Sequence, residues 1–301
     1  MSMSIWPPLP LDELVQAEKA SVSGEQAREL EWLLESLQDT LASIKSGLEE
    51  CVALLAPVEP GSTLVLSSPR SDSLKGFVTR VGTKVKMYGL PPLKGSASYR
   101  LTLSTADPSN TLNLSGLIEV RNLINQSLDV IDVSAWTGDS KDANFISGQL
   151  RLLFDNIQEA RQTLKGPDPL DPSKDWAENP VDPNLFDPPL PSCLSFHLSI
   201  VEAALQLQLR TMEPVDAPPA SLTGFDFRSR LAVAIGASKI PTHDERDETF
   251  RYKGEEVRVK EKVRVESQDP NLMAMMAKLA ALEHNVALSR KALDIVMGKE
   301  D

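Results

Sequence analysis

The sequence predicts an α+β protein: a leucine-zipper-like helical bundle of antiparallel type, with the N- and C-terminal helices paired, beside a mostly antiparallel β domain. Three observations predict it. Apolar residues recur at heptad spacing near both chain ends, two further segments carry helical apolar stripes, and other stretches alternate apolar and polar residues. We therefore assign residues 24–56, 110–165 and 270–298 to a helical domain, and residues 62–104 and 192–266 to a β domain.

The first predicted helix covers residues 24–56. Ser23 is placed to cap its start, Gln26 to complete a capping box, and Pro57 and Pro60 mark its end. Its apolar residues recur at alternating spacings of four and three, which is typical of a helix that packs along one seam. The seam consists of Leu30, Leu34, Leu37, Leu41, Ile44, Leu48, Cys51 and Leu55.

A matching seam occupies the C-terminal helix, which we expect to start behind a cap at Asp269 and Pro270. Its members are Leu272, Met275, Leu279, Leu282, Val286, Ser289, Leu293 and Val296. Because chain ends can meet within one chain or between two copies, this pattern leaves an intramolecular bundle and a homodimer both open. We expect a monomer.

Two more helices are predicted, over residues 110–132 and 140–165, the second ending at Gly166-Pro167. The expected inward residues are Leu114, Leu117, Ile118, Ile124, Leu128 and Ile131 in the first and Ile146, Leu150, Leu153, Ile157, Ala160 and Leu164 in the second. Four helices with apolar stripes favour a single bundle.

Alternation of period two predicts strands at residues 63–67, 77–87 and 99–103. Within 194–209 the inward set shifts by one residue, which indicates a β-bulge or a bend. Valines alternate with charged residues over 257–265, as expected for a sheet with one face in water.

Two segments fit neither period. Residues 166–191 hold eight of the 22 prolines and many carboxylates, which predicts an extended acidic connection, and residues 213–248 are expected to be flexible. Trp176, Leu185 and Phe186 stand out in the first segment. They either pin it onto the folded body, which we favour, or contact a partner protein.

Composition argues against several classes of partner. A formal net charge of −12 disfavours nucleic acid and anionic membrane surfaces, and no apolar run is long enough to insert into a bilayer. Cys51 and Cys193 lie far apart within apolar patterns, which predicts buried thiols in a reducing compartment. Residues 1–10 lack signal-peptide features, so we expect a cytoplasmic protein.

Searches for chemistry identify no catalytic, cofactor-binding or metal-binding residues, so we expect a protein that is not an enzyme and needs no cofactor. No glycine-rich phosphate loop occurs, and His197, His243 and His284 lack the spacing of a zinc site. We interpret His197 and His284 as solvated positions on a strand and a helix. An enzyme whose site is assembled only by tertiary contacts is the alternative.

Four blocks of sequence resemble one known family. The first is Glu-Leu-Glu-Trp-Leu-Leu at 29–34 with Leu-Gln-Asp at 37–39 and Leu41, and the second combines Leu-Lys-Gly-Phe-Val-Thr at 74–79, Val-Lys-Met at 85–87 and Val-Arg-Asn at 120–122. The third is Leu-Pro-Ser at 190–192, and the fourth is Val-Arg-Val-Glu at 263–266. In order and spacing they are similar to the Rogdi family, which includes the second subunit of the fungal regulator of the vacuolar and endosomal ATPase (RAVE) complex.

The resemblance implies a non-catalytic adaptor that promotes assembly of the vacuolar-type proton ATPase. Its implied partners are a large β-propeller subunit, a Skp1-type adaptor and soluble-sector subunits of the pump, with peripheral recruitment to vacuolar and endosomal membranes. Residues 166–189 and 213–248 match no part of the family pattern. A generic coiled-coil scaffold or homodimeric tether unrelated to the pump is the alternative function.

Overall fold

The structure is a computed structural model that describes nine stretches of the chain. These are residues 10–56, 63–68, 71–88, 104–105, 111–134, 141–167, 175–187, 189–215 and 243–299. The expected strand at 99–103 lies outside the described residues.

The chain forms two compact units. The helical unit comprises Met1–Val52, Arg121–Arg161 and Ala277–Asp301, and the β unit comprises Ala53–Val120 and Gln162–Met276. The boundaries between the two units fall inside the long helices. The helical unit is therefore smaller than the helical domain expected from the sequence. The expected α+β class is confirmed.

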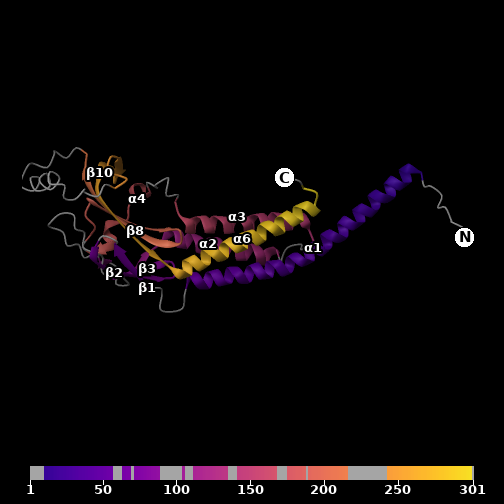
Figure 1. Ribbon diagram of the computed structural model, residues 1–301, viewed down its shortest axis with the longest axis horizontal. Helices are drawn as coiled ribbons and strands as arrows, with labels where there is room; N and C mark the ends of the chain where they lie inside the picture. The colour runs from indigo at the N-terminus through magenta and orange to yellow at the C-terminus, as the bar shows by residue number, and fades with distance from the viewer. Residues whose placement is uncertain are drawn as a thin grey trace, which may run out of the picture. The chain divides into compact units, whose positions relative to one another are not determined.

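Four helices run side by side in the bundle of the helical unit (Figure 1). They are α1 (Leu11–Leu55), α2 (Ser115–Asp132), α3 (Ala143–Lys165) and α6 (Pro270–Val296). Lys45 Nζ on α1 donates to Asp132 Oδ1 on α2 at 2.6 Å, and Arg161 Nη2 on α3 donates to Glu283 Oε1 on α6 at 3.2 Å. These partly buried pairs tie neighbouring helices at the bundle surface.

The N- and C-terminal helices pair in antiparallel orientation within one chain. A Cβ built on Gly47 of α1 would lie 2.7 Å from Leu282 Cδ2 on α6, so the two helices approach closely there. Glu50 of α1 forms an ion pair with Lys278 of α6. Residue numbers therefore rise along α1 as they fall along α6, from Gly47 beside Leu282 to Glu50 beside Lys278.

The heptad seams are buried almost as the sequence predicts. Leu30 is partly exposed, while the buried members are Leu34, Leu37, Leu41, Ile44, Leu48, Cys51 and Leu55 on α1 and Leu272, Met275, Leu279, Leu282, Val286 and Leu293 on α6. All six inward residues expected on α3 are buried. On α2, Ile118 and Leu128 are partly exposed and the other four are buried.

Two helix starts were wrong. Helix α1 begins at Leu11 rather than at residue 24, with the Glu13 amide donating to the Pro10 carbonyl at 2.9 Å, so Ser23 lies inside the helix and caps nothing. A single glycine inside a helix costs only about 1 kcal/mol, so Gly24 does not end it. Helix α2 begins at Ser115 because residues 111–113 pair with a strand instead.

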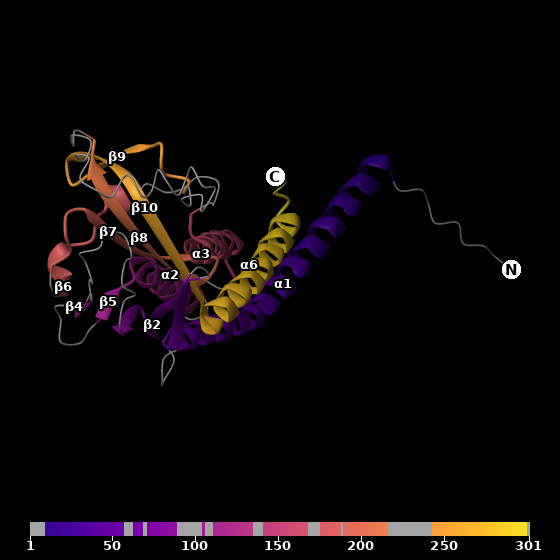
Figure 2. The same ribbon diagram turned by 60° about the vertical axis from the view of Figure 1, so that its left-hand side comes forward.

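In the part of the β unit that the structure describes, the strands form two four-stranded antiparallel sheets and a two-stranded one. The first sheet has the order β1 (Thr63–Ser68), β2 (Ser71–Val81), β3 (Lys84–Tyr88), β5 (Thr111–Asn113). The second has the order β7 (Leu194–Val201), β8 (Ala204–Pro214), β10 (Glu255–Gln268), β9 (Thr249–Tyr252), seen in Figure 2. The third joins β4 (Ser104–Thr105) to β6 (Phe186–Asp187), which directly follows the short 3-10 helix η2 (Pro183–Leu185), whereas the short helix α4 (Asp175–Glu178) contacts β7 and β9.

Tight turns replace two features expected from the sequence. The strand expected at 77–87 is a hairpin of β2 and β3, which turns at Gly82 with φ of +61°. The phase shift inside 194–209 is a two-residue hairpin turn and not a bulge: Glu202 and Ala203 adopt φ of 50° and 58° between β7 and β8. Positive φ at both central residues matches the twist of the flanking strands.

A buried arginine in the β unit joins β2 to the ends of two helices. Arg80 is completely buried, and its Nε donates to Asp269 Oδ2 just before α6. Its Nη1 donates to the carbonyls of Leu55 at 2.5 Å and Gly82 at 3.0 Å, and its Nη2 to that of Leu54 at 3.1 Å. The guanidinium therefore caps the C-terminus of α1.

Asp269 has a second role at the start of α6, as the sequence predicted. Its Oδ1 accepts from the amides of Asn271 at 2.9 Å and Leu272 at 3.4 Å, which satisfies donors that a helix N-terminus leaves free. One carboxylate thus balances the buried charge of Arg80 and caps α6.

We predict that Leu41→Asp destabilises the bundle by several kcal/mol, because Leu41 is 2% exposed and the substitution buries a charge without a partner. Leu288→Asp, at a position 54% exposed on α6, is the matched control and should change little. Urea unfolding followed by helical circular dichroism measures both. An unchanged midpoint for Leu41→Asp would contradict the assigned seam.

We also predict that Asp269→Ala lowers the free energy of unfolding by roughly 3–5 kcal/mol, because it leaves the Arg80 guanidinium buried and unbalanced. The control is Glu266→Ala, which removes an exposed partner of Arg264 and should cost below about 1 kcal/mol. Chemical denaturation of the purified variants measures both free energies of unfolding. Equal stability of the two variants would show that the buried pair is not needed.

Candidate interaction surface

The N-terminal half of α1 has no partner helix among the described residues. Counting back from the contact of Gly47 with Leu282 at equal rise, α6 ends opposite about residue 33 of α1. Figure 1 shows α1 continuing past that end. Every described side chain from residue 15 to residue 29 is exposed, and Leu30 is only partly buried. From Leu30 toward the N-terminus, no other described helix packs against the seam of α1.

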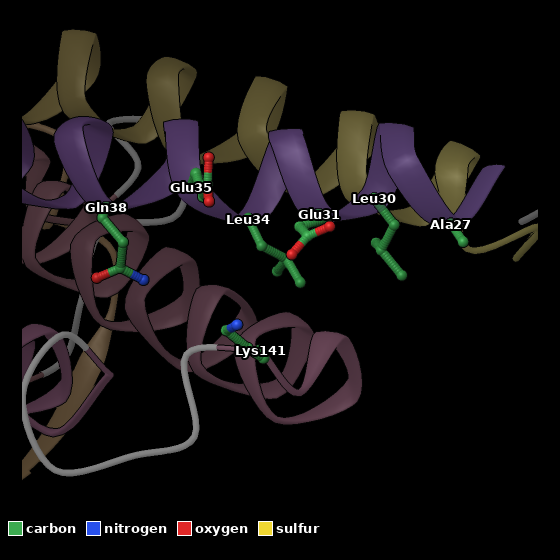
Figure 3. A pocket seen from close by; sticks show the side chains of 7 residues that line it. All are labelled: Ala27, Leu30, Glu31, Leu34, Glu35, Gln38 and Lys141. Carbon is green, nitrogen blue, oxygen red and sulfur yellow. The ribbon is translucent and has the colours of Figure 1, made fainter. Parts of the chain in front are cut away.

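A groove lies where the cover ends (Figure 3). Its cavity volume is about 340 Å³, and it is lined by Ala27, Leu30, Glu31, Leu34, Glu35 and Gln38 of α1 and by Lys141 just before α3. Figure 3 shows Leu30, Glu31 and Gln38 directed from α1 toward the side on which Lys141 lies. The groove thus has an apolar floor and carboxylates beside it.

Helical periodicity places these side chains together. Ala27, Leu30 and Leu34 continue the heptad seam, whereas Glu31 and Glu35 are four residues apart on the neighbouring face. The Gln38 Nε2 is buried and donates to no acceptor among the residues that the structure describes. The groove can therefore offer apolar contact and the negative charge of Glu31 and Glu35, with Lys141 as a positive charge in its lining.

Large apolar side chains are also exposed on the outer faces of the helical unit. Trp32 on α1 is 66% exposed, and Leu288 and Ile295 lie one heptad apart on α6 at 54% and 66%. Tryptophan is enriched among residues that dominate binding energy at protein interfaces. These positions are candidate contacts that the sequence analysis did not single out.

Trp176, Leu185 and Phe186, the large apolar residues of the acidic segment 166–191, differ in solvent exposure. Trp176 and Phe186 are 2% exposed, which fits pinning and removes them as contacts for a partner. Phe186 packs edge-on against Phe196 at a centroid distance of 5.1 Å. Leu185 is 43% exposed and is the member of this set that a partner could reach.

Trp176 belongs to a charged cluster in the β unit. The Arg210 guanidinium lies 4.5 Å from the Trp176 ring centroid and donates to both Glu245 oxygens, at 2.7 and 2.8 Å. Lys262 Nζ donates to Glu245 at 2.7 Å and to Asp244 at 2.9 Å. Residues 243–248, expected to be flexible, therefore form an ordered turn in which Glu245 is 5% exposed.

Sequence reasoning missed this cluster because its partners are distant along the chain. The alternation of β8 gave no signal either, because Arg210 lies on the same strand face as the polar residues Gln206 and Gln208 and therefore looks solvated. A buried arginine demands a carboxylate partner. The sequence does not say which carboxylate supplies it.

Burial sets the titration of several groups in this region. Burial alone would raise the pKa of Glu245, but hydrogen bonds from Arg210 and Lys262 outweigh it and hold the pKa below its ordinary value. Burial lowers the pKa of His197, aided by nearby Arg210 and opposed by Asp175. His197 is half-buried, so its expected solvated position was wrong, whereas His284 is exposed as expected.

The two cysteines differ. Cys51 is buried in the α1 seam, and burial raises the pKa of its thiol to about 12, so it behaves as a small apolar side chain. Cys193 is exposed, contrary to expectation.

The described residues lack two kinds of feature. In the part of the chain that the structure describes, no three or more His, Cys, Asp or Glu side chains gather in a way that could hold a metal ion. Among those same residues, no helix combines the length and apolar character needed to cross a membrane.

Comparison with known proteins places the chain among relatives. A family model described as "Rogdi leucine zipper containing protein" matches residues 29–294, which include parts of both units. The chain is also similar to a Schizosaccharomyces pombe protein named "Regulator of V-ATPase in vacuolar membrane protein 2". The two are 25% identical over 285 residues, covering 86% of this chain and 90% of that protein.

The Glu245 cluster predicts a pH dependence of stability. Because the folded pKa of Glu245 is depressed, its contribution is complete above its unfolded value near 4.5 and is lost as the pH falls through the folded pKa. We predict that Glu245→Gln is less stable than the parent at pH 7 and that the difference shrinks below about pH 4.5. Glu248→Gln, an exposed change in the same turn, is the control. A constant difference from pH 7 to pH 3 in denaturant titrations would contradict the assignment.

Proposed function

The chain belongs to the Rogdi family, and from that premise we propose that it is a non-catalytic adaptor in the regulation of the vacuolar-type proton ATPase, which promotes assembly of the pump. The observation that carries the proposal is the extent of the match. It reaches from residue 29 to residue 294, and the relative named as a regulator of this pump is covered over 90% of its length. The matched residues include parts of both units, so the similarity is not confined to one of them.

Features of the helical unit support an adaptor. A buried heptad seam gives the bundle a stiff core, while Trp32, Leu288 and Ile295 stay exposed on its outer faces. Exposed aromatic and aliphatic side chains on a stiff scaffold are suited to binding proteins. An adaptor needs binding surfaces in a fixed arrangement and no catalytic site.

The proposed partners follow from the family. They are a large β-propeller subunit, a Skp1-type adaptor and soluble-sector subunits of the pump. The protein works in the cytoplasm and is recruited peripherally to vacuolar and endosomal membranes. A net charge of −12 repels an anionic membrane surface, so recruitment runs through these partners and not through lipid.

The uncovered half of α1 supports one alternative, a coiled-coil tether in which two copies pair. Light scattering separates the two functions, because a mass near the 32.9 kDa of the chain rules out a stable homodimer. A dimer mass would favour the tether.

We predict that the tagged chain, purified from its own cells, brings with it the β-propeller subunit, the Skp1-type adaptor and pump subunits, and that Trp32→Asp reduces their recovery severalfold. The substitution puts a charge at a position 66% exposed, so the fold should survive while apolar contact is lost. Leu152→Asp, at a position 50% exposed on α3, is the matched control. Quantitative mass spectrometry of the recovered proteins is the measurement.

Recovery of neither the propeller subunit nor any pump subunit would sink the proposal. Equal recovery with Trp32→Asp would leave the adaptor role standing and remove Trp32 from its contact surface.

A further inference from the structure

We infer that the groove beside the N-terminal half of α1 is a docking site for an amphipathic helix of a partner protein that carries lysine or arginine next to its apolar stripe. The inference rests on the proposed function only in assuming that the chain binds partner proteins. It adds a place and a chemistry for one of those contacts.

The seam itself indicates a helix as occupant. Leu34 is 6% exposed, covered by the bundle, while Leu30, at the next seam position, is partly exposed and Ala27, one more position along, is exposed. A second helix laid against these positions would extend an interface that already exists, with the same heptad geometry. The cavity of about 340 Å³ offers room for a few side chains rather than for a folded domain.

Charge indicates that the occupant is basic. Residues 11–35 contain seven acidic and two basic side chains, so this half of α1 is strongly negative. Glu31 and Glu35 lie directly beside the apolar floor, are both exposed, and line the groove together with one cation, Lys141, so the lining keeps a net negative charge. Lysine or arginine flanking the partner's apolar stripe would meet them, as charges flanking a coiled-coil seam do.

The same charges disfavour a second copy of this chain. Antiparallel pairing of two α1 segments would bring Asp12, Glu13, Glu18 and Glu25 of each copy against acidic residues of the other. Like charges across a helix pair suppress that pairing. The observations therefore favour a different protein with the opposite charge.

The first experiment measures binding of a defined probe to the full chain. The probe is a synthetic helical peptide of about three heptads with leucine at the seam and lysine beside it, and its counterpart carries glutamate in place of lysine. We expect the leucine and lysine peptide to bind the parent chain, more weakly as salt rises, and the glutamate peptide not to bind.

Two double variants with the same change in net charge separate the groove from general acidity. Glu31→Lys with Glu35→Lys should weaken binding of the lysine peptide about tenfold or more, while Glu18→Lys with Glu25→Lys, outside the groove, should weaken it less than about twofold. All four positions are exposed, so both variants should melt like the parent. Equal weakening by the two variants, or binding of the glutamate peptide, would overturn the inference.

The second experiment identifies the occupant in cells. A photoreactive residue at Ala27, in the groove, should crosslink to another protein through a segment with excess lysine and arginine and helical apolar spacing; one at Glu25 should not. Crosslinking to a second copy, to residues 1–9 of the same chain, or to nothing would overturn the inference. Recovery of pump subunits is measured separately, so failure of the groove and failure of the adaptor role are distinguishable.

Discussion

The buried pair of Arg80 and Asp269 is the interaction on which the arrangement of the long helices depends. Arg80 takes the last carbonyls of α1, and Asp269 both neutralises it and holds the first amides of α6. A guanidinium completely removed from water is tolerated only with a carboxylate at hydrogen-bonding distance and its other donors satisfied. Because each of these hydrogen bonds fixes the position of the guanidinium, the end of α1 and the start of α6 are held close together within the β unit.

Unequal lengths of α1 and α6 leave part of α1 without a partner helix among the described residues. Helix α1 has 45 residues and α6 has 27, so an antiparallel pair that begins together leaves α1 without cover at its N-terminal half. Isolated helices without tertiary packing are marginally stable in water, so contacts with a partner protein would stabilise this part of α1. The apolar floor of the groove and the outward Trp32 lie close to that transition, at the point where the bundle still gives α1 a stiff support.

Apolar periodicity in the sequence predicted the buried faces of the helices, but it could not predict side-chain pairs between residues far apart along the chain. The seams of α1 and α6 and the inward face of α3 follow from spacing alone, because burial of one helical face repeats along the chain. The early start of α1 was missed because no cap residue precedes Leu11 in the expected pattern. The pairs of Arg80 with Asp269 and Arg210 with Glu245 join residues 189 and 35 positions apart, and nothing local selects those partners. The groove needs α1 and Lys141, just before α3, placed together, so the heptad seam identified Leu30 and Leu34 but not the other residues that line the groove with them. The family was identified from the order and spacing of short sequence blocks, because apolar periodicity indicates a fold and not a function.

The central claim is that the helical unit holds a partner against the uncovered half of α1. Hydrogen exchange, compared between the free chain and the chain in its native assembly, tests it most directly. In the free chain, amides near residues 41–51 should be protected while those of residues 12–29 exchange fast. In the assembly, protection should spread over residues 27–38 and toward the N-terminus. Exchange of residues 12–38 that is equally fast in both samples would contradict the account.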